Sequence, residues 1–322
     1  MRGIQLSEFG GMENLKLAEI PEPAAPGQND VLLGMEYAPI NFNDLLLVSG
    51  KFPRRPSLPS AVGNEGVGRV LATGSDVTTV KVGDRVIPPL YSYTWRERMI
   101  VPQDELFAIP ENIDPKQAAM LRINPPTAAL MLSEHGNLRP GDWVVQNAAT
   151  SGVGKSVIAF AKARGFKTIN LVRRPESIED ILSSGGDIAL LDNDKAVEKV
   201  ADLTKGGSVR LAIDGVSGRS TVRLLEIVSQ GASLVSYAFS SGEVAIQADL
   251  RPLLRKAVSL FAFYQARPAY DTQMPTLLRQ AVAMVSEGTL KLPVAAVYPM
   301  SDWDAALAHF QKGGKVLLDL KS

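Results

Sequence analysis

Residues 143–174 constrain the fold more than any other stretch of this chain of 322 residues. They read as an apolar strand (WVVQNA), a turn of small residues (ATSGVG), an amphipathic helix (KSVIAFAKARG) and a second apolar strand (KTINLV). This order is typical of a βαβ unit, in which a helix connects two parallel strands. The stretch therefore predicts an α/β fold with helices packed on a sheet.

The turn of this unit has the composition of a dinucleotide site. Gly152 and Gly154 lack the side chains that would keep backbone N–H groups away from a pyrophosphate, and the helix N-terminus adds partial positive charge. The first glycine of a GxGxxG pattern is missing, and Ala148, Ala149 or Thr150 takes its place, depending on the alignment. The turn alone does not establish the site.

Arg173 and Arg174 end the second strand, and Pro175 follows them. Sites that prefer NAD carry Asp or Glu here, which binds the ribose hydroxyls, whereas arginines suit a 2′-phosphate. The pair therefore predicts NADP as the cofactor. The alternative is two solvated arginines on a loop.

Composition excludes several classes of function. The chain has 34 basic and 34 acidic residues, so nothing indicates a nucleic-acid partner. It has no cysteine, which excludes disulfides and thiolate chemistry. Residues 1–15 lack the features of a signal or transit peptide, and no apolar run reaches the length of a membrane span. We therefore expect a globular protein of the cytoplasm with no membrane partner.

The pattern along the chain predicts two domains. Residues 1–120 read as short strands separated by Gly and Pro, with a helix at 41–49 that Asn43 or Asp44 caps or begins. Asn124 is well placed to cap a helix that starts at Pro125. The final segment, KVLLDL, is a strand that returns to the first domain, which makes that domain discontinuous.

After the βαβ unit, helices and strands continue to alternate, which predicts a doubly wound parallel sheet. The expected strands are 187–192, 209–216, 232–240 and 260–267, and the expected helices are 115–123, 177–186, 220–231, 272–290 and 301–314. Residues 251–259 separate the last two of these strands.

Several motifs in this order resemble the medium-chain dehydrogenase/reductase superfamily. They are APINFNDLLLVSG, PSAVGNEGVGRVLATGSDVTTVKVGDRVIP, TWRE, INPPTAALML, QNAATSGVGKSVI, TINLVRR and GKVLLDL. The resemblance covers nearly the whole chain, and it is strongest to the zinc-independent trans-2-enoyl-thioester reductases of mitochondrial type. Quinone oxidoreductases are more distant neighbours. It implies a GroES-like catalytic domain at 1–121 and 289–322 and a Rossmann domain at 122–288.

The same comparison bears on zinc. Zinc alcohol dehydrogenases need Cys and His ligands, including a histidine where this chain has Asn64. Only His135 and His309 are present, far apart in sequence, and packing or surface roles suit both. We expect an enzyme without zinc.

The resemblance also implies cofactor contacts. Asn124 would approach the nicotinamide half, and Arg173 with Arg174 would hold the 2′-phosphate. The pyrophosphate would lie on Thr150, Ser151, Gly152, Val153 and Gly154, and the nicotinamide ribose would pass Tyr237, Ala238, Phe239 and Ser240. Phe263 and Tyr264 would flank the nicotinamide and the substrate, and Lys315 would close over the cofactor. Asn124 as a helix cap only, and Lys315 as a solvated residue, are the alternatives.

The implied reaction is hydride delivery from NADPH to the β-carbon of a conjugated carbonyl. In this family a tyrosine donates a hydroxyl where this chain has Phe52, which cannot donate. Tyr264, which stands where family members carry tryptophan, is one replacement, and Tyr91 or Tyr93 is another. In the third alternative no side-chain acid is needed, and ribose hydroxyl, backbone N–H groups and water suffice.

The substrate is less constrained. Lys51, Arg54 and Arg55 form a basic cluster that suits the phosphates of a long acyl thioester, or else a solvated loop. Without the family tyrosine, an enone, an enal or a quinone is an alternative substrate. A catalytically silent NADPH-binding protein is an alternative of another class. The resemblance further suggests a homodimer joined through the edge of the sixth strand.

Overall fold

The computed structural model describes residues 1–246 and 248–321. Within this part of the chain, the protein forms two compact units. The first comprises Met1–Ile123, Leu278–Ser286 and Leu292–Ser322, and the second comprises Asn124–Leu277 and Glu287–Lys291. The first unit is therefore discontinuous in sequence.

A parallel sheet forms the centre of the second unit. Its strand order is β11 (Ile188–Leu191), β10 (Lys167–Val172), β9 (Trp143–Gln146), β12 (Val209–Asp214), β13 (Ser233–Ser236) and β14 (Ser259–Ala262). Neighbouring strands are parallel throughout. The chain winds outward from β9 in both directions, which is the doubly wound fold predicted from the sequence.

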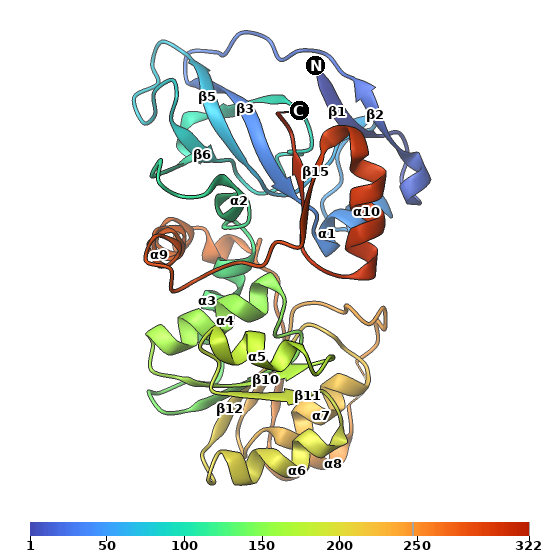
Figure 1. The fold of residues 1–322 in the computed structure, drawn as a ribbon, viewed down its shortest axis with the longest axis vertical. Helices are drawn as coiled ribbons and strands as arrows, with labels where there is room; N and C mark the ends of the chain where they lie inside the picture. The colour runs from blue at the N-terminus through green and yellow to red at the C-terminus, as the bar shows by residue number, and fades with distance from the viewer. Residues whose placement is uncertain (247, 322) are drawn as a thin grey trace. The chain divides into compact units, whose positions relative to one another are not determined.

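Helices cover both faces of this sheet, as Figure 1 shows. They are α3 (Asn124–Glu134), α4 (Gly152–Ala163), α5 (Ser177–Ser183), α6 (Asp194–Leu203), α7 (Arg219–Ile227) and α8 (Leu250–Lys256). Ile169 and Leu171 of β10 belong to the core beneath α6 and α7, whereas Val172 packs with Ile158 of α4 and Ile181 of α5. The two-residue period of the strand thus gives each face its own core.

The first unit is β-rich. Its larger sheet has the order β15 (Ala296–Pro299), β16 (Val316–Asp319), β3 (Asp30–Pro39), β5 (Val67–Thr73), β6 (Arg85–Ile87) and β8 (Phe107–Ile109), with β7 (Arg98–Pro102) paired to β3. A small sheet has the order β2 (Leu15–Glu19), β1 (Arg2–Leu6) and β4 (Ser60–Ala61). The α-helices are α1 (Phe42–Val48), α2 (Pro115–Ala118) and α10 (Trp303–Lys312), and 3-10 turns lie at Met12–Asn14, Gln103–Glu105 and Met300–Asp302.

The C-terminal strand completes the larger sheet. β16 runs antiparallel to β3, with Leu317 opposite Pro39 and Leu318 opposite Ala38. Both leucines are completely buried, so the pairing also closes the core of this unit. In the second unit a 3-10 turn at Pro268–Tyr270 precedes α9 (Met274–Ser286), which begins in that unit and ends in the first.

Two helix starts differ from the sequence prediction. Asn41, rather than Asn43 or Asp44, caps α1, and Asp44 completes a capping box by accepting the Asn41 N–H at 2.7 Å. Asn124 is the first residue of α3 and not the residue before it. Neighbouring Asn and Asp residues are all good caps, and the extended backbone that selects one of them cannot be read from composition.

Other helix predictions also need correction. The sequence pattern does not predict α6 or α8, which lie in segments rich in charge. On α6 only Ala196 and Val200 are buried, so its apolar face is too narrow to stand out among the charged residues. The helix expected at 115–123 ends at Ala118, and turns follow it.

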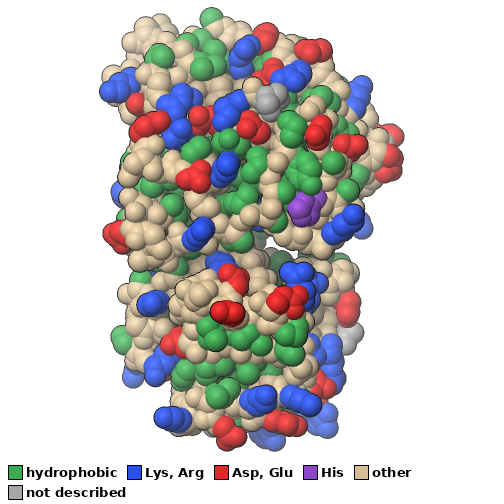
Figure 2. All heavy atoms as spheres, in the orientation of Figure 1, with side chains coloured by type: hydrophobic (Ala, Val, Ile, Leu, Met, Phe, Trp, Pro, Cys, Tyr) green, Lys and Arg blue, Asp and Glu red, His purple; other side chains and the backbone are tan. Residues whose placement is uncertain are grey.

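The surface mixes both charge signs, as Figure 2 shows for the visible face of each unit. This distribution agrees with the equal numbers of basic and acidic residues. Among the described residues, no helix combines the length and hydropathy needed to cross a bilayer.

The first unit buries a charged cluster around Asn41. Lys315 Nζ donates to Asn41 Oδ1 and lies 3.5 Å from the Ile40 carbonyl oxygen. Asn41 Nδ2 donates to Glu65 Oε1 at 2.9 Å, and the Ile123 N–H donates to Glu65 Oε2 at 3.0 Å. The Asn41 amide thus connects an ammonium to a carboxylate inside the core.

Burial raises the pKa of Asp44 and of Glu65 to about 7 and lowers the pKa of Lys315. Asp44 Oδ1 is buried without a hydrogen-bond partner among residues 1–246 and 248–321, which a protonated carboxyl tolerates better than an anion. With one ammonium and two carboxyl groups, the cluster comes closest to neutrality when one carboxyl keeps its proton.

We expect the protein to lose stability as the pH rises through about 7. The folded-state pKa values lie above the ordinary values of 3.8 and 4.5, so the native state holds protons that the unfolded chain has released. The stabilisation from these bound protons is complete below the ordinary pKa values. It is lost as the pH rises toward neutrality. Asp44→Asn removes one of these titrations and keeps an acceptor for the Asn41 N–H. Its thermal unfolding midpoint should fall less than that of wild type between about pH 5 and about pH 8.

Asp104→Asn, on an exposed turn, is the control and should keep the wild-type pH dependence. Equal slopes for Asp44→Asn and wild type would contradict the prediction.

Candidate functional site

The residues singled out in the second unit follow the carboxyl ends of its parallel strands. Gln146 of β9 lies opposite Asn170 of β10 and Ile213 of β12, and Ser236 of β13 lies opposite Asp214 and Ala262. The carboxyl ends of these strands are therefore aligned with one another along the edge of the sheet. Residues 147–154 follow β9, 173–174 follow β10, 237–240 follow β13, and 263–264 follow β14. Ligands of open α/β sheets bind at this edge.

The turn after β9 presents the amino end of α4. Ser151 is the N-cap, and its Oγ accepts the Gly154 N–H at 3.1 Å. Ala148 adopts φ of 48°, the left-handed conformation that a glycine would adopt more easily. Thr150 is exposed beside this end, whereas Val153 is buried. The helix N-terminus thus retains the polarity of an anion site although the first glycine is missing.

Gly152 and Gly154 are required by the protein's own packing. A Cβ on Gly152 would stand 2.8 Å from Asn124 Cγ, and a Cβ on Gly154 would stand 2.5 Å from the Ala149 carbonyl oxygen. Gly152 therefore admits the Asn124 amide to the amino end of α4. Asn124 Nδ2 is buried and has no hydrogen-bond partner in the described part of the chain. A buried donor without a partner at this place fits a cofactor amide or hydroxyl.

A buried network fixes the turn to the neighbouring strand. Asn147 Nδ2 donates to Asp214 Oδ1 at 2.7 Å and to Ser220 Oγ at 2.9 Å, while Asn147 Oδ1 accepts the Gly215 N–H at 2.7 Å. Thr221 Oγ1 donates to Asp214 Oδ2 at 2.5 Å. Every polar atom of the Asn147 amide is therefore satisfied, and its turn is held in one orientation.

Tyr237 lies against the same turn. A Cβ on Gly215 would stand 2.7 Å from Tyr237 Cζ, so only glycine leaves room for the ring. Burial raises the pKa of Tyr237 to about 12, against the opposing effect of its hydrogen bond with Ser151. The phenol is therefore protonated near neutral pH and is joined through Ser151 to the amino end of α4.

The rest of the loop after β13 is tied to the loop after β12. The Ser240 N–H donates to the Gly215 carbonyl at 3.1 Å, and the Gly242 N–H closes a turn on Phe239 at 2.9 Å. Ala238 and Phe239 are half-buried, and Ser240 is exposed.

Both arginines after β10 are exposed. Arg174 Nε lies 3.6 Å from Glu176 Oε1, a contact that contributes little because both side chains are in solvent. Arg173 makes no ion pair with any other described residue. Two cations with so little internal compensation fit a phosphate at this strand end.

Phe263 and Tyr264 follow the edge strand β14. Phe263 is buried, its N–H donates to the Ser236 carbonyl at 2.9 Å, and its ring stacks on Tyr270 with centroids 5.7 Å apart. Tyr264 is half-buried. Hydrogen bonding to β13 thus fixes where Phe263 and Tyr264 lie at the carboxyl end of the sheet.

In the first unit, Phe52 is buried against Tyr91, with ring centroids 5.4 Å apart and a tilt of 56°. Tyr91 and Tyr93 adopt φ of 65° and 56°. Lys315, predicted to close over the cofactor, donates inside this unit to Asn41, and its role toward a cofactor stays a prediction.

The basic cluster of Lys51, Arg54 and Arg55 is exposed and makes no ion pair within the described residues. Aromatic rings hold two of its members: Arg54 lies 5.4 Å from the Tyr91 ring and Arg55 lies 5.6 Å from the Phe9 ring. Uncompensated cations on a loop that aromatic rings support can bind phosphate groups.

The histidines contact aromatic residues in separate units. The His135 ring lies 4.7 Å from that of Phe261, and His309 Nδ1 shares a hydrogen bond of 3.0 Å with the Tyr298 hydroxyl. The described residues contain no group of three or more His, Cys, Asp or Glu side chains that could hold a metal ion.

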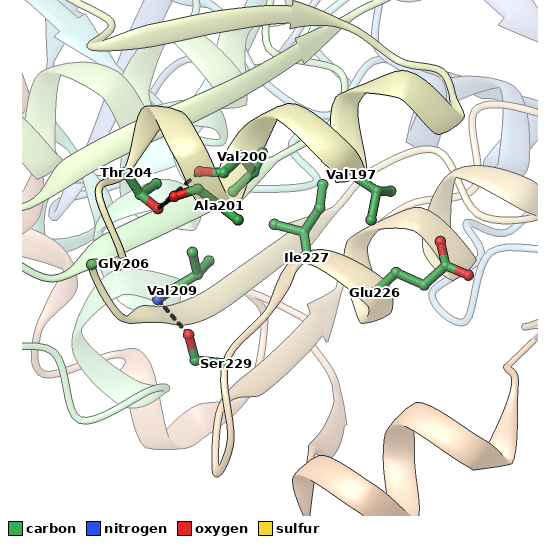
Figure 3. Close-up of a pocket in the computed structure, with 10 residues that line it drawn as sticks. Val197, Val200, Ala201, Thr204, Gly206, Val209, Glu226, Ile227 and Ser229 are labelled. Atoms are coloured by element: carbon green, nitrogen blue, oxygen red, sulfur yellow. Dashed lines mark hydrogen bonds between the residues drawn. The ribbon is translucent and has the colours of Figure 1, made fainter.

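A hollow of about 240 Å³ lies at the amino edge of the parallel sheet, beside Val209 at the start of β12 (Figure 3). Val200 and Ile227 line it, and its polar groups bond to one another: Thr204 Oγ1 donates to the Val200 carbonyl, and the Val209 N–H donates to Ser229 Oγ. The hollow is at the opposite end of the strands from the predicted cofactor residues.

Two family models match the chain. The model described as alcohol dehydrogenase GroES-like domain matches residues 27–111, and the model described as zinc-binding dehydrogenase matches residues 152–283. The first match lies within the first unit, and the second lies in the second unit except for residues 278–283, which belong to the first.

The mitochondrial enoyl-[acyl-carrier-protein] reductase of Homo sapiens is 35% identical over 300 residues, which are 90% of this chain and 80% of that protein. The solved complex of Etr1p with NADP and crotonyl-CoA has a TM-score of 0.90 at 22% identity over 99% of both chains, which shows the common fold. Escherichia coli quinone oxidoreductase complexed with NADPH has a TM-score of 0.87 at 27% identity over 99% of this chain and 100% of that chain.

One prediction is contradicted by these relatives. The human protein and the other curated relatives of similar identity are named as mitochondrial, so the cytoplasmic location predicted from residues 1–15 is wrong. Receptors read address signals that are separate from the folded domain, and the composition of a short stretch does not reveal the compartment.

Matching models in both units and a relative that matches over most of both lengths establish the family. The chain belongs to the medium-chain dehydrogenase/reductase superfamily of oxidoreductases and, within it, to the family of the enoyl-[acyl-carrier-protein] reductases.

Proposed function

We propose that this reductase uses NADPH to reduce the C=C bond of a 2-enoyl thioester, with hydride added to the β-carbon and without zinc. The observation that carries the proposal is the 35% identity to a human enoyl reductase over nine tenths of this chain. The edge of the parallel sheet supports it, because that edge offers the groups that a phosphorylated dinucleotide needs.

In this proposal NADPH, when bound, supplies the hydride. The amino end of α4, with Thr150, Ser151 and residues 152–154, holds the diphosphate through backbone N–H groups. Arg173 and Arg174 hold the 2′-phosphate, and the unpaired Asn124 amide orients the nicotinamide half. Residues 237–240 and Phe263 support the nicotinamide ribose and ring, and Lys315 closes over the cofactor.

The protein must also stabilise negative charge on the thioester oxygen as the hydride arrives. Phe52 packs against the substrate but cannot donate a hydrogen bond. Tyr264 is one candidate donor, Tyr91 or Tyr93 is another, and a mechanism without a side-chain donor is the third possibility.

The absence of zinc is supported by the ligands that the chain lacks. It has no cysteine, and its two histidines belong to different units. Metal analysis of the active enzyme should therefore give far less than one zinc per chain. Stoichiometric zinc that is lost together with activity would refute this part of the proposal.

The test of function is NADPH oxidation with crotonyl-CoA, a 2-enal and a naphthoquinone as separate substrates. The proposal expects the highest kcat/KM with crotonyl-CoA. A preference for the quinone or enal would favour the second candidate, a quinone or enal/enone reductase, which Phe52 and the likeness to quinone oxidoreductase support. Tight NADPH binding without turnover of any substrate would indicate a catalytically silent protein.

Replacement of Arg173 by Asp and Arg174 by Ala should shift the preference from NADPH toward NADH. Each charge-assisted hydrogen bond to the 2′-phosphate contributes about 1.5–3 kcal/mol, so the ratio of kcat/KM values should change roughly a hundredfold or more. Arg255→Ala, an exposed arginine on α8, is the control and should leave the ratio unchanged. An unchanged ratio in the double variant would remove the assignment of the phosphate site.

The basic cluster should matter only for substrates that carry phosphates. Lys51→Ala with Arg55→Ala should raise KM for crotonyl-CoA roughly tenfold, because two uncompensated cations are lost, and should leave KM for the N-acetylcysteamine thioester unchanged. Lys16→Ala with Lys81→Ala removes two exposed lysines elsewhere in the first unit and is the matched control. Equal effects on both thioesters would show that the cluster does not bind phosphate.

We also propose that two copies pair through the edge strand β14. Leu260 and Phe261 on this strand are 41% and 42% exposed, and Leu254 on the adjacent α8 is 79% exposed. An exposed apolar edge strand favours pairing with another chain. Leu260→Lys should lower the sedimentation mass from dimer to monomer, whereas Leu203→Lys on exposed α6 should not. A monomeric wild type at micromolar concentration would refute the dimer.

A further inference from the structure

Tyr91 is an aromatic residue that packs against Phe52. Their ring centroids are 5.4 Å apart, and both residues belong to the first unit. The two side chains therefore occupy one region of the first unit, with their rings in contact. Tyr91 thus brings a phenol to the region in which the family resemblance places a tyrosine and this chain has Phe52.

The backbone at Tyr91 is strained. A φ of 65° is uncommon for a bulky residue, and Tyr93 repeats it with 56° two residues later. Such conformations cost on the order of 1 kcal/mol each and persist only where surrounding contacts enforce them. Strain of this kind is concentrated at active sites, where it places a side chain that a relaxed loop would not.

Several hydrogen bonds hold this loop in place. The Tyr91 N–H donates to the Asn64 carbonyl at 3.0 Å, and the Thr94 N–H donates to the Gly63 carbonyl at 3.0 Å. Ser92 Oγ donates to the Pro89 carbonyl at 2.6 Å, and Arg96 donates to the Ser92 carbonyl at 3.0 Å. Because the loop is held at several points, the Tyr91 ring is positioned before any substrate arrives.

The surroundings of Tyr91 are polar and cationic. The Arg54 guanidinium lies 5.4 Å from the centre of its ring, where positive charge makes a phenol a stronger hydrogen-bond donor. Asn64, whose carbonyl accepts the Tyr91 N–H, is completely buried, and neither atom of its side-chain amide has a partner in the described part of the chain. Unsatisfied buried amides need an explanation, and a substrate or a water beside this loop would supply one.

We propose that the Tyr91 hydroxyl donates the hydrogen bond to the thioester oxygen that the residue at position 52 cannot donate. This inference rests on the proposed reduction of an enoyl thioester. As hydride forms the new C–H bond at the β-carbon, the C=C electron pair moves toward the carbonyl oxygen and generates an enolate. Tyr91 keeps its proton and stabilises this oxygen, and a solvent proton then forms the C–H bond at the α-carbon.

The test removes the hydroxyl from residue 91 and then introduces one at residue 52. Tyr91→Phe should lower kcat with crotonyl-CoA roughly tenfold to a hundredfold, the range for loss of one donor to a developing oxyanion, with NADPH affinity unchanged. The double variant Phe52→Tyr with Tyr91→Phe should recover most of the lost kcat. Tyr298→Phe, which removes a phenol elsewhere in the first unit, should keep the wild-type rate.

A Tyr91→Phe variant with wild-type kcat would overturn the inference and leave the enoyl reductase function standing. A loss of kcat that Phe52→Tyr does not recover, in a double variant with wild-type thermal unfolding and NADPH affinity, would overturn it as well, since packing alone would then explain the loss. Absence of turnover in the wild type would instead refute the proposed function, and this inference with it.

Discussion

The hydrogen bond between Asn147 and Asp214 is the interaction on which the second unit's site depends. It joins the ends of β9 and β12 inside the protein, and the same amide holds the Gly215 N–H. The turn that leads to Ser151 and α4 begins at this residue. Loss of either partner would leave a buried polar group unsatisfied and release the turn. This buried bond therefore fixes the direction of the helix N-terminus that we propose as the anion site.

In the first unit, buried charged side chains hold distant segments together. Asn41 caps α1 and at the same time connects Lys315 to Glu65. Buried charges are costly unless they are paired and hydrogen-bonded, and here one amide provides bonds to both signs. The connection joins α1 and the segments before β5 and β16, which are far apart in the chain. The same cluster connects the start of α1, the helix before Phe52, to the start of β16.

The sequence predicts much of this arrangement. Strand and helix periods suffice for the doubly wound sheet, and residues that follow parallel strands must meet at one edge, which brings residues 147–154 and 237–240 together. Side-chain networks are different because they depend on distances across the fold. Asp214 stands at a predicted strand end and could have been noticed there, but its bond to Asn147 needs the order of β9 and β12. Likewise, Asn41, Glu65 and Lys315 are 24 and 250 residues apart along the chain, and nothing local marks them as neighbours.

We propose that hydride from NADPH reaches the β-carbon of an enoyl thioester and that the α-carbon takes its proton from solvent. Incubation of the protein with crotonyl-CoA and NADPH deuterated at C4 of the nicotinamide, followed by NMR of the butyryl product, tests it most directly. We expect deuterium at the β-carbon and ordinary hydrogen at the α-carbon, with the pattern reversed for unlabelled NADPH in heavy water. Deuterium from NADPH at the α-carbon, or reduction of the thioester carbonyl with the double bond intact, would contradict it.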